Sequence, residues 1–166
     1  WPDAETLREH LARTRRPSVR HALHLGRALA SLHALELHDD AWPIASVPWA
    51  LSLHEPDLYW YRLSSVANIA LLELLQAFPA LGTELSALRA DWRPTALTHG
   101  DLKWDNIVVR PRQPGRAALL WLVDWESAAI GDPAWDVGSI FGEYLLAWFH
   151  SIPPPDAGAG PAHDLA

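Results

Sequence analysis

The sequence contains no cysteine and no methionine among its 166 residues. Without cysteine the chain has no disulfide framework and no thiol chemistry, as is typical of a reducing compartment, so we expect a cytoplasmic protein. No apolar run reaches the roughly 18 residues that a membrane-spanning helix needs, so we expect no membrane span. The missing methionine predicts that translation begins upstream of Trp1, and we interpret the 166 residues as an excerpt of a longer chain.

Basic residues are also scarce in this chain. Lysine and arginine total 13 against 20 aspartates and glutamates, which gives a formal net charge of -7. A nucleic-acid-binding domain needs a basic stripe that neutralises phosphates, so this balance argues against a nucleic-acid partner. Hydrophobic residues nevertheless make up 49% of the chain, and tryptophan occurs 10 times. We therefore expect a packed core.

Hydrophobic periodicity predicts a mainly helical chain. Helices are expected at Ala4–Arg13 with Asp3 as N-cap, Ser18–Leu35, Ser65–Phe78, Leu81–Ala90 and Ala134–His150. Residues 39–56 carry three prolines and no clear period, which indicates an irregular loop. Residues 151–166 are rich in proline, glycine and alanine and are expected to form a loop or linker, which leaves residues 1–150 as the folded unit.

The spacing of apolar residues also predicts which helix faces are buried. On the second helix the expected face contains Val19, Ala22, Leu23, Gly26, Ala30 and Leu32, with Gly26 permitting close packing. On the last helix the expected inner residues are Val137, Ile140, Phe141, Leu145 and Phe149.

The period changes between these helices, where two short apolar runs predict a β-hairpin. Ile107–Val109 and Leu119–Val123 are separated by a turn-rich segment with two prolines and a glycine. A hairpin returns the chain to its starting end. We therefore expect Asp101 and Asn106, which precede the hairpin, to lie close to Asp124, which follows it.

Two carboxylates and an amide around one small volume suit phosphoryl transfer. This reaction needs a group that orients the acceptor hydroxyl and a divalent metal that neutralises phosphate charge. Mg²⁺ prefers hard oxygen ligands. The pattern predicts that Asp101 orients the hydroxyl and that Asn106 and Asp124 hold the metal. Turn and capping roles for these residues are the alternative, because aspartate and asparagine favour such places.

Three motifs in this region resemble those of a known family. His99–Asn106 resembles the Brenner-type catalytic loop of aminoglycoside phosphotransferases, choline kinases and homoserine kinases. Leu122–Glu126 resembles the metal-binding segment of that family, and Gly131–Asp136 resembles its following G-D-P-x-x-D motif. The resemblance implies an α+β, mainly helical fold, in which residues 1–150 are the C-terminal catalytic lobe of a protein-kinase-like enzyme and a short hairpin carries the active site. It also implies ATP and Mg²⁺ as cofactors.

The resemblance also implies a role for each matching residue. Asp101 matches the catalytic base, Asn106 a ligand of the nucleotide-bound metal, and Asp124 the main metal ligand. His99 matches a residue that braces the loop. Asp136 matches a buried helix carboxylate that accepts backbone N–H bonds from the catalytic loop, which is a structural role.

Lys103 departs from the commonest small-molecule pattern, in which a histidine or an uncharged residue stands at this position. Protein Ser/Thr kinases place a lysine there, close to the transferred phosphate. A positive group beside the base is expected to steady developing phosphate charge, and a solvated loop lysine is the alternative. Asp105 is expected to cap or face solvent, and Glu126 to ligate a second metal or to be exposed. Trp104 and Trp125 are expected to pack within the protein.

A nucleotide clamp is missing from the sequence. There is no G-x-G-x-x-G motif, and Lys103 is the only lysine. Family members supply this clamp from an N-terminal lobe. We therefore expect that lobe to lie outside these residues, and the 166 residues alone to be inactive.

Three functions remain open at this point. The first is a kinase that phosphorylates a small alcohol, such as an aminoglycoside or a choline-like compound, or Ser and Thr in a peptide of a ribosomal natural-product pathway. Lys103 favours the peptide, and the Ala/Arg/Pro/Trp-rich composition fits antibiotic resistance or natural-product biosynthesis in a GC-rich bacterium. The second is a pseudokinase that binds another biosynthetic enzyme or a precursor peptide. The third is a metal-dependent hydrolase, for which His99 is the only nearby histidine.

Overall fold

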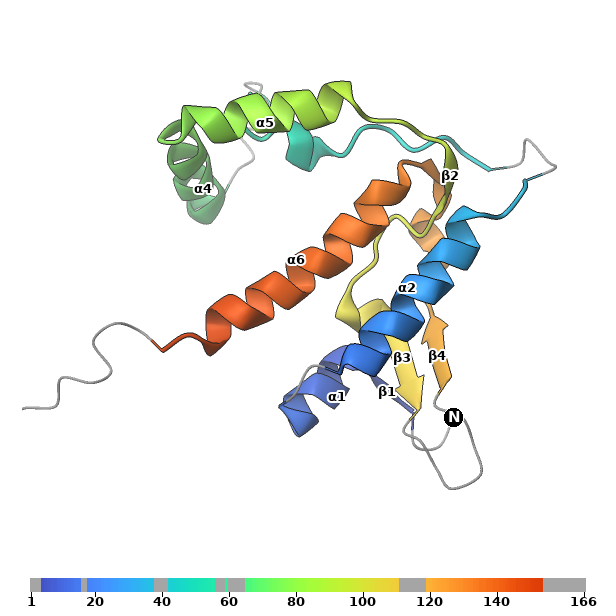
Figure 1. Cartoon of the computed structure of the whole chain (residues 1–166). Coiled ribbons are helices and arrows are strands. Elements are labelled where there is room, and N and C mark those ends of the chain that lie inside the picture. The colour runs from blue at the N-terminus through green and yellow to red at the C-terminus, as the bar shows by residue number, and fades with distance from the viewer. Residues whose placement is uncertain are drawn as a thin grey trace, which may run out of the picture.

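A computed structural model describes residues 4–15, 18–37, 42–55, 59, 65–110 and 119–153 of the chain. The α-helices in these ranges are α1 (Leu7–Thr14), α2 (Val19–His33), α4 (Val66–Gln76), α5 (Pro79–Ala90) and α6 (Pro133–Ser151). The strands are β1 (Glu5–Thr6), β2 (Ala96–Thr98), β3 (Ile107–Arg110), β4 (Leu119–Leu122) and β5 (Ala129–Gly131). Three 3-10 turns, η1 (Trp49–Ser52), η2 (Trp104–Asn106) and η3 (Trp125–Ser127), complete the elements (Figure 1). The mixed and mainly helical class expected from the sequence is confirmed.

The predicted hairpin is confirmed, and it belongs to a three-stranded antiparallel sheet. β3 pairs with β4 in a register that places Ile107 opposite Leu122, and β1 lies on the other side of β3. The prediction of a helix from Ala4 was wrong at its start, because Glu5 and Thr6 pair with β3 as a strand. Thr6 then caps α1 through a capping box with Glu9. The expected cap Asp3 lies outside the described residues.

A second, two-stranded sheet positions the beginning of the candidate loop. β2 and β5 are antiparallel, with Ala96 opposite Gly131 and Thr98 opposite Ala129. Residues 42–55, the described part of the predicted irregular loop, are largely irregular. They contain only a parallel bridge from Ile44 to Ile130 and the short turn η1. The sequence analysis missed β2 and β5, since three-residue strands are too short to show a period.

The core lies between the three-stranded sheet and helices α1, α2 and α6. Its buried members are Leu7, Leu11, Leu25, Leu29, Leu32, Leu97, Leu102, Trp104, Ile107, Val109 and Ile140. Two of them, Leu102 and Trp104, belong to the candidate loop itself. The loop is therefore anchored to the core by its own apolar side chains, while its polar residues remain outside that cluster.

The predicted helix faces were mostly wrong. On α2 only Leu32 of the expected residues is buried, whereas Val19 is 86% exposed. The buried face is Leu25, Leu29 and Leu32, and a methyl group at Gly26 would meet nothing within 4 Å. On α6 only Ile140 of the expected residues is buried, and Val137, Phe141, Leu145 and Phe149 are exposed. Apolar residues occur on every side of α6, so periodicity alone does not identify the face that packs.

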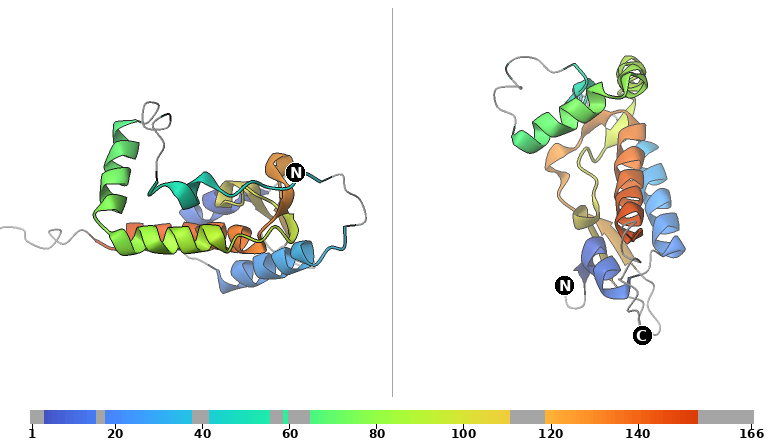
Figure 2. Two further views of the ribbon diagram at one scale, coloured as in Figure 1. Left: turned by 90° about the horizontal axis from the view of Figure 1, so that it is seen from above. Right: turned by 90° about the vertical axis from the view of Figure 1, so that its left-hand side faces the viewer.

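Helices α4 and α5 lie at the opposite end of the molecule from α1 and the three-stranded sheet (Figures 1 and 2). Ser65 caps α4, accepting a hydrogen bond from the backbone N–H of Asn68. Helix α5 begins at Pro79, two residues earlier than predicted, because proline suits the first helical position. Within the described ranges, no single helix is long and apolar enough to cross a membrane. Helices α4 and α5 together have the required length and composition, but a 98° bend separates them.

The chain boundaries expected from the sequence are only partly covered. Helix α6 continues to Ser151, one residue beyond the predicted end of the folded unit. Residues 154–166, most of the predicted linker, lie outside the described ranges.

Candidate active site

The loop that follows β2 turns sharply at Gly100. Its φ angle of 81° lies in the left-handed region, which glycine adopts without steric cost. A Cβ atom at this position would lie 2.3 Å from the carbonyl oxygen of Ser127. The backbone of the His99–Asn106 loop therefore passes directly against the end of η3. This close approach brings the first two sequence motifs together.

Asp136, on α6, binds the backbone at the start of this loop. Its side chain is 0% exposed. Its Oδ2 accepts a hydrogen bond from the backbone N–H of His99 at 2.8 Å, and its Oδ1 accepts one from Gly100 at 3.0 Å. His33 Nε2 donates to Oδ2 at 3.0 Å. The backbone hydrogen bonds expected for Asp136 are thus present, and His33 is a partner that the sequence analysis did not identify.

His99 connects the loop to the segment after β4. Its buried ring donates from Nε2 to the carbonyl oxygen of Val123 at 2.8 Å, so Nε2 carries a proton. The backbone N–H of Val123 in turn donates to the carbonyl oxygen of Asn106 at 3.0 Å. Val123 is thus bonded to both ends of the loop, and Asp124 is the next residue in the chain.

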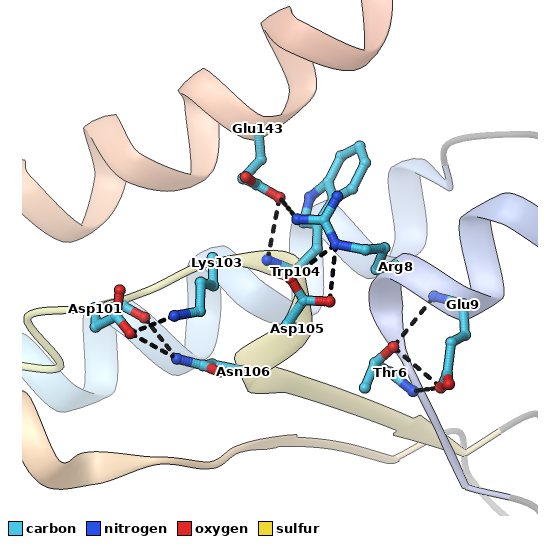
Figure 3. A network of polar contacts seen from close by, with 9 residues as sticks. All are labelled: Thr6, Arg8, Glu9, Asp101, Lys103, Trp104, Asp105, Asn106 and Glu143. Atoms are coloured by element: carbon cyan, nitrogen blue, oxygen red, sulfur yellow. Dashed lines mark hydrogen bonds and ion pairs between the residues drawn. The ribbon is translucent and has the colours of Figure 1, made fainter. Parts of the chain in front are cut away.

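Asp101, Lys103 and Asn106 form a compact polar cluster (Figure 3). Lys103 Nζ donates to Asp101 Oδ2 at 2.6 Å. Asn106 Nδ2 donates to the same carboxylate oxygen at 3.2 Å and to the Asp101 carbonyl oxygen at 2.8 Å. Asn106 is buried, whereas the side chains of Asp101 and Lys103 are 41% and 42% exposed. The carboxylate is therefore held from inside and open to solvent outside.

The hydrogen bond to Asp101 raises the pKa of Lys103 above its ordinary value, and the negative charges of Asp101, Asp124 and Asp105 add to this effect. Lys103 is consequently protonated at neutral pH and provides a fixed positive charge beside Asp101.

Asp124 has an unusual backbone conformation. Its φ and ψ angles of 67° and 61° lie in the left-handed region, and its side chain is exposed. Such a conformation in a residue other than glycine is uncommon and is often found at functional sites. Glu126 is also exposed, and within the described ranges no hydrogen bond or ion pair joins it to Asp101, Asn106 or Asp124.

The donor atoms at this point fit a phosphate-bound Mg²⁺ better than a metal held by protein alone. In the described part of the chain, no group of three or more His, Asp or Glu side chains converges as a metal site. Asn106 uses its Nδ2 toward Asp101, so Oδ1 is the atom that a metal could take as a ligand. Together with the Asp124 carboxylate it supplies two hard oxygen donors. Mg²⁺ commonly takes one or two protein carboxylates and completes its shell with phosphate oxygens and water.

A second group of residues contacts the loop on the side away from the Asp101 cluster (Figure 3). These contacts were not predicted from the sequence. Arg8 Nε on α1 donates to both carboxylate oxygens of Asp105, at 2.8 and 2.7 Å (Figure 3). Its Nη2 donates to Glu143 Oε2 on α6 at 2.9 Å. Asp105 faces solvent, as the sequence led us to expect, and is ion-paired with Arg8 as well. A separation of 97 positions between Arg8 and Asp105 leaves no local signal for this pair.

The loop, the hairpin and the buried Asp136 together define a kinase-like phosphotransferase. A family comparison agrees, because the model of the phosphotransferase enzyme family, APH, matches residues 2–160. The chain belongs to this family, and the resemblance noted in the sequence is confirmed. No curated protein matches the sequence.

Proposed function

We propose that this chain carries the active site of an ATP- and Mg²⁺-dependent kinase that phosphorylates a hydroxyl group. Membership of the phosphotransferase family supports the reaction class. The observation that carries the proposal is the joining of Asp101, Lys103 and Asn106 in one hydrogen-bonded cluster, with Asp124 connected to it through Val123. In this proposal residues 1–150 form the C-terminal catalytic lobe.

Asp101 is the proposed base and Lys103 its electrostatic partner. The Asp101 carboxylate is half-exposed, so an acceptor hydroxyl can reach it and donate its proton. Lys103, held 2.6 Å from that carboxylate, places positive charge beside the oxygen that attacks phosphorus. Asn106 Oδ1 and Asp124 would hold Mg²⁺, which neutralises the charge of the transferred phosphate when it is bound with ATP. Glu126 is a weaker candidate for a second metal.

The acceptor is proposed to be either a small alcohol of the aminoglycoside or choline type or a Ser or Thr side chain in a peptide of a ribosomal natural-product pathway. Lys103 favours the peptide, because a lysine at this position is the protein-kinase pattern. An aminoglycoside acceptor would place the enzyme in antibiotic resistance, and a ribosomal peptide acceptor would place it in natural-product biosynthesis. We further propose a cytoplasmic enzyme that works with a small-molecule or peptide substrate, and with a partner protein if the substrate is a precursor peptide.

Mass spectrometry of the complete gene product tests this proposal. The protein is incubated with ATP, Mg²⁺ and a panel of aminoglycosides, choline-like alcohols and Ser/Thr peptides, and one acceptor class should gain a single phosphate. Titration with ATP, with and without Mg²⁺, separates the alternative. A protein that neither transfers phosphate nor binds ATP in a Mg²⁺-dependent way is the pseudokinase.

Asp101→Asn is the variant that tests the base. It should lower kcat by about 10²- to 10⁴-fold, because the amide keeps the size of the side chain but cannot accept a proton. Asp91→Asn, at a surface position, is the matched control and should leave kcat unchanged. Full activity of Asp101→Asn would remove Asp101 from the role of base.

The 166-residue chain alone is proposed to be inactive, because its sequence contains no G-x-G-x-x-G motif and no lysine besides Lys103. A steady-state phosphotransfer assay on this chain checks the expectation. Sustained turnover would show that the nucleotide is held by residues within these 166.

A further inference from the structure

The turn that carries Asn106 has little stability of its own. η2 contains only Trp104, Asp105 and Asn106, and a single 3-10 turn of this length is not stable in isolation. Two backbone hydrogen bonds close it, one from the N–H of Asn106 to the carbonyl oxygen of Lys103 at 2.9 Å and one from the N–H of Ile107 to the carbonyl oxygen of Trp104. The position of Asn106 therefore depends on what holds η2 from outside.

Arg8 connects η2 to two helices. Its guanidinium binds Asp105 in η2 and Glu143 in α6, while the side chain itself belongs to α1. Glu143 Oε2 also accepts the backbone N–H of Trp104 at 3.3 Å. Figure 3 shows Arg8 between Asp105 and Glu143, on the opposite side of η2 from the Asp101 cluster. One cation thus joins all three elements around the turn.

Burial of neighbouring groups strengthens this arrangement. The Glu143 side chain is only 19% exposed, and Trp104 is buried. The Arg8 guanidinium carbon lies 5.8 Å from the centre of the Trp104 ring, and that ring meets the Tyr144 ring edge-on. The hydrogen bond to Asp105 raises the pKa of Arg8, with the charge of Glu143 contributing. Without Arg8, the half-exposed Asp105 carboxylate and the more buried Glu143 carboxylate would both lose their cationic partner.

We propose that Arg8 is a positioning residue for phosphoryl transfer. By binding Asp105 and Glu143 together, it fixes η2 and so holds the Asn106 amide against Asp101. The orientation of Asn106 Oδ1, the ligand atom for Mg²⁺, follows from that contact. Arg8 acts through η2 and does not itself belong to the Asp101 cluster. This inference rests on the proposed kinase function.

Arg8→Gln in the complete gene product is the test, with Arg13→Gln as the matched control. Arg13 lies on the same helix and bonds to Glu5 on β1 and to His10 on α1, and to no residue of η2 within the described ranges. Arg8→Gln should lower kcat by about 10- to 100-fold, the usual effect of losing a residue that orients a metal ligand. It should also raise the Mg²⁺ concentration that gives half-maximal rate, and leave the acceptor KM within about twofold of the wild-type value.

Arg8→Lys separates charge from geometry. Lysine keeps the positive charge but lacks the planar fork that spans two carboxylates, so the variant should recover only part of kcat. A merely structural role predicts a different pattern, in which Arg8→Gln and Arg13→Gln shift the urea midpoint alike and the folded enzymes keep wild-type kcat. That pattern would overturn the proposal.

Amide hydrogen exchange provides a readout that does not depend on activity. Arg8→Gln should accelerate exchange at the backbone N–H groups of Trp104 and Asn106, and Arg13→Gln should not. If the wild-type protein transfers no phosphate and Arg8→Gln still accelerates exchange, the kinase proposal is wrong. Arg8 then anchors η2 but has no catalytic role. If the wild-type protein is active and Arg8→Gln changes neither exchange nor kcat, the kinase proposal stands and the inference about Arg8 is wrong.

Discussion

Asp136→Ala should be among the most damaging single substitutions that leave the Asp101 cluster chemically intact. The carboxylate is completely buried and accepts hydrogen bonds from the backbone N–H groups of His99 and Gly100. Alanine leaves both donors unpaired in the interior, at about 1–3 kcal/mol each. His33, which loses its bond to Asp136, is partly exposed and can bind water instead. We therefore expect the free energy of unfolding to fall by about 2–6 kcal/mol.

Urea denaturation followed by tryptophan fluorescence measures this loss, and a constant m-value would show that the unfolded state is unchanged. Asp132→Ala is the matched control at the start of the same helix, because Asp132 also accepts two backbone N–H groups, that of Ala134 as the cap of α6 and that of Arg93, but both at exposed positions. Loss of a cap costs about 1 kcal/mol. Asp136→Asn should be nearly as harmful as Asp136→Ala, because its amide N–H would face one of the two backbone donors.

The reasoning fails if Asp136→Ala costs no more than Asp132→Ala. That result would mean that the loop donors find water or other acceptors, and that the buried carboxylate offsets its hydrogen bonds with its own desolvation cost. Amide exchange at His99 and Gly100 then decides between these causes, since exposure to water accelerates exchange at both positions.

Two further substitutions test the loop and the first sheet. Gly100→Ala should destabilise the fold by about 2–5 kcal/mol, because the left-handed φ angle and the clash with Ser127 both oppose a side chain there. Gly26→Ala is the control and should raise the thermal midpoint slightly, because a methyl group there meets nothing within 4 Å. Equal thermal midpoints for the two variants would contradict this prediction. The hydrogen bond from Arg13 lowers the pKa of Glu5 from 4.5 to about 2, so its stabilisation is complete above pH 4.5 and is lost as pH falls toward 2. Urea unfolding of Glu5→Gln should therefore differ from wild type at pH 7 and converge with it near pH 2, and a difference that persists at pH 2 would refute the pairing.

Elements with a local signal were predictable from the sequence. The hairpin was, because its two short apolar runs flank a segment rich in turn residues, and β3 and β4 pair there. Helix α4 was also predictable, since Ser65 supplies a cap just before an apolar run. β2 and β5 were not, because each has three residues and is stabilised by pairing with a partner more than thirty residues away. The start of α1 was missed for the same reason, as Glu5 and Thr6 are extended only because β3 pairs with them.

Helix faces were harder to predict than helices. α6 carries Phe141, Leu145 and Phe149 in the expected stripe, yet all three are exposed. The face that packs is set by Asp136 and Ile140, one turn apart. A buried carboxylate contradicts the rule that burial follows apolarity, and its hydrogen bonds from the loop N–H groups and from His33 explain why it lies inside.

The same contrast runs through the candidate site. Asp101, Asn106 and Asp124 could be proposed from the sequence because hydroxyl orientation and metal binding demand particular side chains at short spacings, and a hairpin brings such spacings together. Arg8 was not identifiable, because its function is to hold Asp105, and many cations at many positions in a chain satisfy that demand equally well. The reaction limits which residue types can stand at the reacting centre. A residue that only positions them needs no more than a charge or a hydrogen-bond donor at the right place after folding. We therefore expect the residues that position this site to come from helices far away in sequence, as Arg8 of α1 and His33 of α2 do.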